Sequence, residues 1–204
     1  MKQNILPAFR LTLICLIFFS GFYTLVIFGI AQAAPNGGKG EIIMSEKSQL
    51  KSKQLGKTSD FPKMTSYYYS NIGQKFDKDD YFWSRPSAVD YNAAGAGGSN
   101  KGPSNPDYLN TVRERIDNFI KHNPDVKKSE IPSDLVTASG SGLDPNISVQ
   151  AAKVQVKRIA KIRNIGENEI QQIIASNTEK PIFGILGTEK INVLKLNIAL
   201  DGLK

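Results

Sequence analysis

The chain has 204 residues, 40% of them hydrophobic, and a formal net charge of +7. This is the composition of a folded protein, and the length allows one ordinary domain plus a membrane segment. A positive charge alone would suggest nucleic acid as a partner, but many of the lysines are confined to one polar stretch, residues 39–63. We therefore expect no nucleic-acid groove. Cys15 is the single cysteine, which excludes an intrachain disulfide and a thiolate metal site.

Residues 11–30 form an uncharged run rich in Leu, Ile and Phe. A helix rises ~1.5 Å per residue, so this run matches the ~30 Å hydrocarbon core of a bilayer. A cleaved signal peptide is the alternative, because Ala-Gln-Ala at 31–33 has the form of a cleavage site and Lys2 and Arg10 supply a basic leader. The run exceeds the roughly 7–15 apolar residues of a signal peptide. We expect a transmembrane helix at 11–30 after a cytoplasmic tail at 1–10.

The orientation of this helix follows from the cations beside it. Lys2, Arg10 and the amino terminus precede the run, whereas the first cation after it, Lys39, is partly offset by Glu41. The side with the lysine and arginine excess stays in the cytoplasm. The sequence therefore predicts a single-pass protein whose soluble domain is extracytoplasmic.

The chain beyond the apolar run divides into two parts by composition. Residues 31–66 are rich in Gly, Ser and Lys and poor in aromatic residues, which is typical of a flexible tether. Aromatic residues become frequent from Tyr67 onward. We expect one compact soluble α+β domain at 67–204, with the aromatic side chains packed in its core or at an interface. A stretch rich in Gly and Pro, residues 91–106, predicts a long structured loop that forms an interaction surface.

Four further segments have helical or extended patterns. Residues 106–122 form a helix capped by Asn105, with His122 as a capping residue at its end. A helix at 149–163 begins after the N-cap Ser148; a second, shorter helix covers 167–175. Residues 191–203 alternate as a strand would, yet Asn192 and Gly202 suit helix caps, and we favour the helix. The helix at 149–163 is expected to bury Ala152, Val156, Ile159 and Ala160 and to expose Lys153, Lys157, Arg158, Lys161 and Arg163.

Before the helix at 149–163, an apolar run passes into small and hydroxyl-bearing residues. Residues 135–137 suit a short buried extended segment, while Gly140 and Gly142 allow positive φ and a close backbone approach. A plain flexible connection has the same composition and stays open as an alternative. The other interpretation is a loop that receives a ligand or a second backbone.

Several motifs resemble the C subunits of the Kdp potassium-transporting ATPases. The match is carried by Val-Thr-Ala-Ser-Gly-Ser-Gly-Leu-Asp-Pro-Asn-Ile-Ser at 136–148, Tyr-Phe-Trp-Ser-Arg-Pro-Ser-Ala at 81–88, Gly-Gly-Ser-Asn-Lys-Gly-Pro-Ser-Asn-Pro at 97–106 and Asn-Val-Leu-Lys-Leu-Asn at 192–197. The chain departs from the family pattern at Ser84, where Gly is usual, and at Asn146, where His is usual. The second departure weakens any role there that needs a cation or a proton carrier.

The resemblance implies an accessory, non-catalytic subunit of an ATP-driven potassium uptake complex in the bacterial inner membrane. Its partners would be a channel-like potassium-binding subunit, a P-type ATPase subunit, a small single-span subunit and membrane lipid. The family's proposed role is a catalytic chaperone that raises the ATP affinity of the pump. A secreted or signal-anchored extracytoplasmic enzyme or binding domain is the alternative.

Two sets of site residues follow from the resemblance. The candidate nucleotide or partner loop comprises Ser139, Gly140, Ser141, Gly142, Asp144, Asn146 and Gln150. The candidate docking set comprises Arg85, Gly97, Gly98, Ser99, Asn100 and Pro103. The expected cofactor is ATP shared with the ATPase subunit, with no covalently bound group, no metal and no catalytic residue. Sharing cytoplasmic ATP requires a cytoplasmic domain, which the charge bias argues against.

Overall fold

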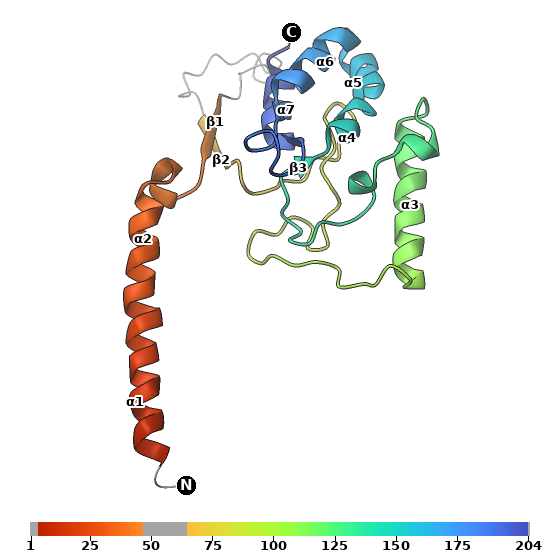
Figure 1. Cartoon of the computed structure of the whole chain (residues 1–204). Coiled ribbons are helices and arrows are strands. Elements are labelled where there is room, and N and C mark those ends of the chain that lie inside the picture. Colours follow the sequence, from red (N-terminus) through yellow and green to blue (C-terminus); the bar gives the residue numbers. More distant parts are fainter. Residues whose placement is uncertain (1–3, 47–64, 204) are drawn as a thin grey trace, which may run out of the picture. The chain divides into compact units, whose positions relative to one another are not determined.

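The computed structural model describes residues 4–46 and 65–203. The chain divides into two compact units, Met1–Ile42 and Ile43–Lys204. In the first unit α1 (Ile5–Leu16), a π-helical stretch (Ile17–Tyr23) and α2 (Thr24–Gln32) follow one another as a single helix (Figure 1).

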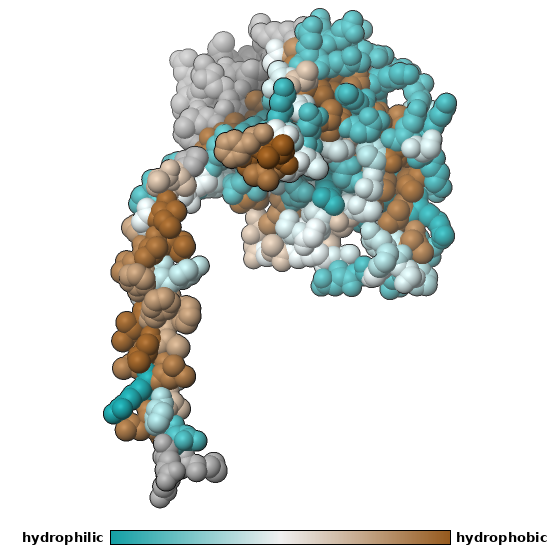
Figure 2. Space-filling model, viewed as in Figure 1, coloured by the Kyte–Doolittle hydropathy of each residue, from teal (hydrophilic) through white to brown (hydrophobic). Residues whose placement is uncertain are grey.

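This helix, Ile5–Gln32, is long and apolar enough to cross a membrane. Its length of 28 residues corresponds to about 42 Å at ~1.5 Å per residue, which exceeds the hydrocarbon core. Figure 2 shows hydrophobic side chains along its visible face. The helix starts at Ile5, so residues 5–10, which the sequence analysis assigned to a cytoplasmic tail, are helical. A short 3₁₀ turn, Pro35–Gly38, follows the helix.

The second unit combines five helices with short strands among its described residues, which confirms the α+β class. Its helices are α3 (Pro106–His122), α4 (Val149–Lys153), α5 (Val156–Arg163), α6 (Glu167–Ser176) and α7 (Val193–Asp201). The strands are β1 (Ile42–Glu46), which starts at the last residue of the first unit, and β2 (Thr65–Tyr69), β3 (Asn146–Ile147), β4 (Thr178–Glu179) and β5 (Lys190–Asn192). Strands β1 and β2 form one sheet, and β3-β5-β4 form another.

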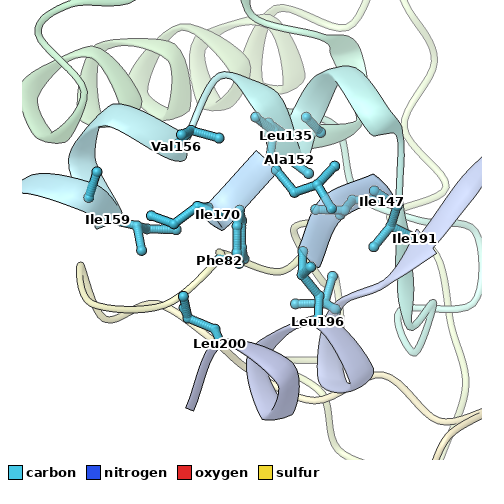
Figure 3. Packing of buried hydrophobic residues seen from close by; sticks show 14 of the residues in the cluster. Phe82, Leu135, Ile147, Ala152, Val156, Ile159, Ile170, Ile191, Leu196 and Leu200 are labelled. Carbon is cyan, nitrogen blue, oxygen red and sulfur yellow. The ribbon is translucent and has the colours of Figure 1, made fainter. Parts of the chain in front are cut away.

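The three-stranded sheet is antiparallel throughout. Ile147 pairs with Ile191, and Thr178 pairs with Ile191 from the other side. The core collects apolar side chains from this sheet, α4, α5, α6 and α7 around Phe82, which enters from a segment without helix or strand (Figure 3). Ile159, Ile170 and Leu196 are fully buried there.

The expected helix at 149–163 is interrupted, which corrects the sequence prediction. Gln155, between α4 and α5, is fully buried. Its side-chain amide donates to the Ala151 carbonyl (2.9 Å) and its oxygen accepts from the Trp83 amide (2.8 Å). Arg158, expected on an exposed face, is also buried. The amphipathic pattern predicted Arg158 on the exposed face, but hydrogen bonds with distant segments stabilise both polar side chains inside the domain.

Residues 135–137 are likewise different from expectation. Leu135 and Val136 are buried as predicted, but Ser133–Leu135 is a 3₁₀ turn and not an extended segment. The Thr137 amide and hydroxyl both donate to the Ser133 carbonyl, at 2.8 and 2.7 Å, and close this turn. Local hydrogen bonding by a threonine hydroxyl competes with an extended conformation.

The predicted starts of α3, α4 and α7 are confirmed. Asn105 accepts a hydrogen bond from Tyr108 N, Ser148 from Ala151 N and Asn192 from Lys195 N. Residues 193–201 are therefore helical, and Gly202 occupies the C-cap. The expected role of His122 is wrong: Asn123 occupies the C-cap of α3, and Nδ1 of His122 lies 2.8 Å from an Asp79 oxygen.

Candidate functional site: a glycine-rich loop platform

The loop at 139–144 lies against three distant segments of the compact unit. The Gly73 amide donates to the Leu143 carbonyl (2.7 Å), the Ser139 amide to the Pro86 carbonyl (3.2 Å), and the Gly97 amide to the Ser141 carbonyl (2.8 Å). The two predicted sets of site residues therefore meet where Gly97 of the docking set contacts Ser141 of the candidate nucleotide or partner loop. We call residues 97–100 and 139–144 the loop platform.

Close backbone packing explains the glycines of the loop platform. Gly142 has φ +69°, and a Cβ built there would lie 2.6 Å from Val89 Cγ2 and 2.8 Å from the Gly97 carbonyl oxygen. A Cβ on Gly98 would lie 3.0 Å from the Gly140 oxygen, whereas one on Gly140 meets no described atom within 4 Å. Gly142 is thus required by both conformation and space.

The polar side chains of the loop accept hydrogen bonds from nearby backbone amides. Ser139 is buried, and its hydroxyl accepts a hydrogen bond from the Gly142 amide (2.9 Å). The Ser141 hydroxyl accepts from the Leu143 amide (3.1 Å), and Asp144 accepts from the Asn146 amide (3.0 Å). These bonds fix the loop backbone and occupy donors that an anion would otherwise bind.

Arg85, predicted as a docking residue, contacts the loop from within the domain. Its Nη1 lies 3.0 Å from Asp144 Oδ2, with both side chains about one quarter exposed. Its Nε donates to the Thr137 carbonyl at 3.5 Å. The hydroxyl of Tyr91 donates to the Arg85 carbonyl, and burial raises the pKa of Tyr91 to about 12. Arg85 therefore helps to hold Asp144 in place.

The remaining predicted residues form the accessible part of this region. Asn146 and Gly97 are partly buried, and Gly98 is too. The exposed members are Ser99, Asn100, Pro103, Gly140, Ser141 and Gln150. Asn100 adopts φ +52°, a left-handed conformation that asparagine tolerates. The surface thus offers small polar side chains and a backbone held by hydrogen bonds.

Sequence reasoning missed a buried polar cluster around Arg158. Its guanidinium donates to Asn123 Oδ1 (3.0 Å), Gln155 Oε1 (2.7 Å) and the Tyr81 carbonyl (3.1 Å), and lies 4.8 Å from the ring centroid of Trp83. Burial lowers the pKa of Arg158 to about 10. One sign of the burial of Arg158 was visible in the sequence, because residues 151, 155 and 158 are spaced four and three positions apart and so lie on one helical face, which buries Ala151.

The site contains no recognisable metal centre in the ranges that the structure describes, 4–46 and 65–203: no group of three or more His, Cys, Asp or Glu side chains lies close enough to hold an ion. The loop platform has the chemistry of a shaped, mostly neutral surface. It can bind another surface through shape and through hydrogen bonds to Ser99, Asn100 and Ser141.

Comparison with known proteins identifies the family. The family model described as KdpC, the K+-transporting ATPase c chain, matches residues 5–202. The potassium-transporting ATPase KdpC subunits of Flavobacterium psychrophilum and Flavobacterium johnsoniae are 50% and 51% identical to this chain over 202 residues, covering 99% of it and 100% of each relative. The subunit of Geobacter sulfurreducens is 43% identical over 205 residues, 98% of both chains. From its membrane-length helix to α7, the chain belongs to the KdpC family.

Proposed function

We propose that this chain is an accessory, non-catalytic subunit of an ATP-driven potassium uptake complex, anchored in the membrane by Ile5–Gln32. The observation that carries the proposal is the match of nearly the whole chain to subunits named for a potassium-transporting ATPase. Its partners are then a channel-like potassium-binding subunit, a P-type ATPase subunit and a small single-span subunit. The chain contributes to assembly or stabilisation of this complex.

The loop platform is the docking surface in this proposal. Its backbone is held in place because the Gly73 amide donates to the Leu143 carbonyl, the Gly97 amide to the Ser141 carbonyl, and the Ser139 amide to the Pro86 carbonyl. A surface that is already ordered loses little conformational entropy when a partner binds. Long loops without helix or strand in a compact domain are commonly functional, and the segment from Ser70 to Asn105 is of this kind.

A nucleotide-binding role receives less support from the same geometry. Phosphate binding at a loop uses unpaired backbone N–H groups, but the amides of Gly142, Leu143 and Asn146 already donate to side chains of the loop. The charge bias beside the apolar run favours an extracytoplasmic domain, away from cytoplasmic ATP. We therefore favour a structural role at the external entrance of the potassium-conducting subunit over a role in raising ATP affinity.

Affinity purification of the tagged full chain from membranes, followed by identification of the co-purifying chains, tests the proposal. We expect the potassium-binding and ATPase subunits to be recovered. A Ser99→Arg, Ser141→Arg double variant should reduce their recovery, because both exposed positions lie on the loop platform. Asn118→Arg, at an exposed position of α3, is the matched control. Recovery of no transport subunit with the unmodified chain would contradict the accessory role, and full recovery with the double variant would contradict the docking surface.

A further inference from the structure

The loop between β4 and β5 presents a cluster of large apolar side chains to solvent. Residues 181–187 read Pro-Ile-Phe-Gly-Ile-Leu-Gly and contain no charged or polar side chain. Ile182 is 65% exposed, Phe183 88%, Ile185 80% and Leu186 58%. Figure 2 shows a hydrophobic patch where Figure 1 places the connection between α6 and α7. We call residues 181–187 the apolar tip.

Four backbone amides of the apolar tip donate to carbonyl oxygens within the tip itself. The Ile182 and Leu186 amides donate to each other's carbonyl oxygens, both at 3.0 Å, and the Gly184 amide donates to the Pro181 carbonyl at 2.9 Å. The Ile185 amide donates to the Ile182 carbonyl at 3.3 Å. A segment that enters hydrocarbon must pair its backbone groups internally, because no water is available there. The apolar tip meets this requirement at four of its amides.

The chemistry of the apolar tip fits lipid better than a protein groove. Protein interfaces carry about one hydrogen bond per 100–200 Å², and the apolar tip has no side chain that can form one. Charged residues begin at its edges, with Lys180 before it and Glu189 and Lys190 after it. An apolar end with a charged base is the pattern of a segment that lies in the membrane interface.

The membrane-length helix of the same chain also indicates that lipid is the partner of the apolar tip. Ile5–Gln32 is a membrane-length helix in the same polypeptide, so the compact unit stays within a chain's length of a bilayer. Tethering converts a weak second contact into an intramolecular one with a high effective concentration. The contact made by these four apolar side chains is therefore stronger than the same contact made by an untethered domain.

We propose that the apolar tip inserts into the interfacial layer of the bilayer to which the chain is anchored and forms its second membrane contact. Its apolar side chains contact lipid at the boundary between headgroups and acyl chains. This contact orients the compact unit relative to the membrane surface. The inference rests on the membrane anchor and is independent of the partnership with a potassium pump.

Collision measurements on the full chain test the contact. A nitroxide is attached to Phe183→Cys in a Cys15→Ser background, and the protein is reconstituted without other subunits in vesicles of phosphatidylethanolamine and phosphatidylglycerol. We expect the label to collide more with oxygen, which concentrates in lipid, than with a water-soluble nickel chelate. The same label at Glu114→Cys, an exposed position of α3, should show the opposite preference.

Two further variants separate insertion from other causes. Ile185→Asp with Leu186→Asp should shift the label at position 183 to collisions with the nickel chelate, since charges oppose insertion. Ile162→Asp, at an apolar position 49% exposed on α5, should leave the label unchanged. Equal nickel accessibility at 183 and 114 in these vesicles would overturn the proposal. Protection at 183 that requires the transport subunits would overturn it too, and would assign the apolar tip to a protein partner.

Discussion

The side-chain amide of Asn197 pairs with both backbone polar groups of Phe82. Asn197 Oδ1 accepts from the Phe82 amide at 2.9 Å, and Nδ2 donates to the Phe82 carbonyl at 3.0 Å. Both residues are buried. A side chain of α7 thus supplies the hydrogen bonds that a neighbouring strand would supply, and Phe82 can enter the core from a segment without regular structure.

Replacing Asn197 should therefore destabilise the compact unit. In Asn197→Leu both backbone groups of Phe82 lose their partner, and each unsatisfied buried group costs about 1–3 kcal/mol. We expect the free energy of unfolding to fall by about 2–5 kcal/mol in urea denaturation of the full chain in detergent. Asn118→Leu, on the exposed face of α3, is the control. Equal stability of the two variants would show that the pair does not hold Phe82.

A glycine pair tests the packing of the loop platform. Gly142→Ala places a Cβ 2.8 Å from the Gly97 oxygen at a positive φ, whereas Gly140→Ala has space. We expect the first variant to lose about 1–3 kcal/mol of stability and the second to change little. Chemical denaturation measures both, and co-purification of the transport subunits should decline with Gly142→Ala alone. Identical behaviour of the two alanine variants would argue against the close contact.

Arg158→Met tests the buried polar cluster. The substitution preserves much of the apolar stem but leaves Asn123 Oδ1 and the Tyr81 carbonyl without the guanidinium that donates to them. We expect a loss of about 2–4 kcal/mol in the free energy of unfolding. Lys157→Met, one residue earlier and exposed, should change stability by less than about 0.5 kcal/mol. A similar effect of both substitutions would contradict a specific role for Arg158.

Alkaline pH should reveal the burial of Tyr91. Burial raises the pKa of this phenol from 10.0 to about 12, so between these values the folded protein binds a proton that the unfolded chain has released. The stabilising contribution of Tyr91 is complete below pH 10 and is lost as pH rises toward 12. Arg158, whose pKa is lowered from 12.5 to about 10 on folding, acts in the opposite direction throughout this range.

The contribution of Tyr91 is isolated by comparison with Tyr91→Phe. Arg158 and all other titrating groups are present in both proteins, so their contributions cancel in the comparison. The stability advantage of the unmodified chain over this variant should decrease between pH 10 and 12, because only the unmodified chain has the Tyr91 phenol. Thermal unfolding at several pH values measures the difference. A pH-independent difference would contradict a raised pKa for Tyr91.

Membrane topology is decided by a cysteine at position 141. Ser141 is exposed on the loop platform, so Ser141→Cys with Cys15→Ser should react in intact cells with a membrane-impermeant thiol reagent if the domain is extracytoplasmic. We expect this labelling. Protection in whole cells with labelling after lysis would place the domain in the cytoplasm and make nucleotide sharing the better account.

Local chemistry allowed much of the fold to be predicted from the sequence. Asn105, Ser148 and Asn192 each cap the helix that follows, because a cap bond spans only three residues. The membrane-length helix follows from an uninterrupted apolar run, and α6 from the spacing of Ile170 and Ile174. These signals lie within a few turns of chain and need no distant partner.

Only the tertiary structure decided which polar residues lie inside. Arg158 reads as part of a basic helical face, yet carbonyls and side chains from distant segments pair with it and make burial favourable. Strands β3, β4 and β5 have two or three residues each, too few for a periodic pattern, and exist through their pairing. The contact of Gly97 with Ser141 likewise joins loops whose separate sequences contain no information about their distance. Local sequence determines caps and helical faces, whereas the position of a buried polar group depends on partners that only the folded chain brings near.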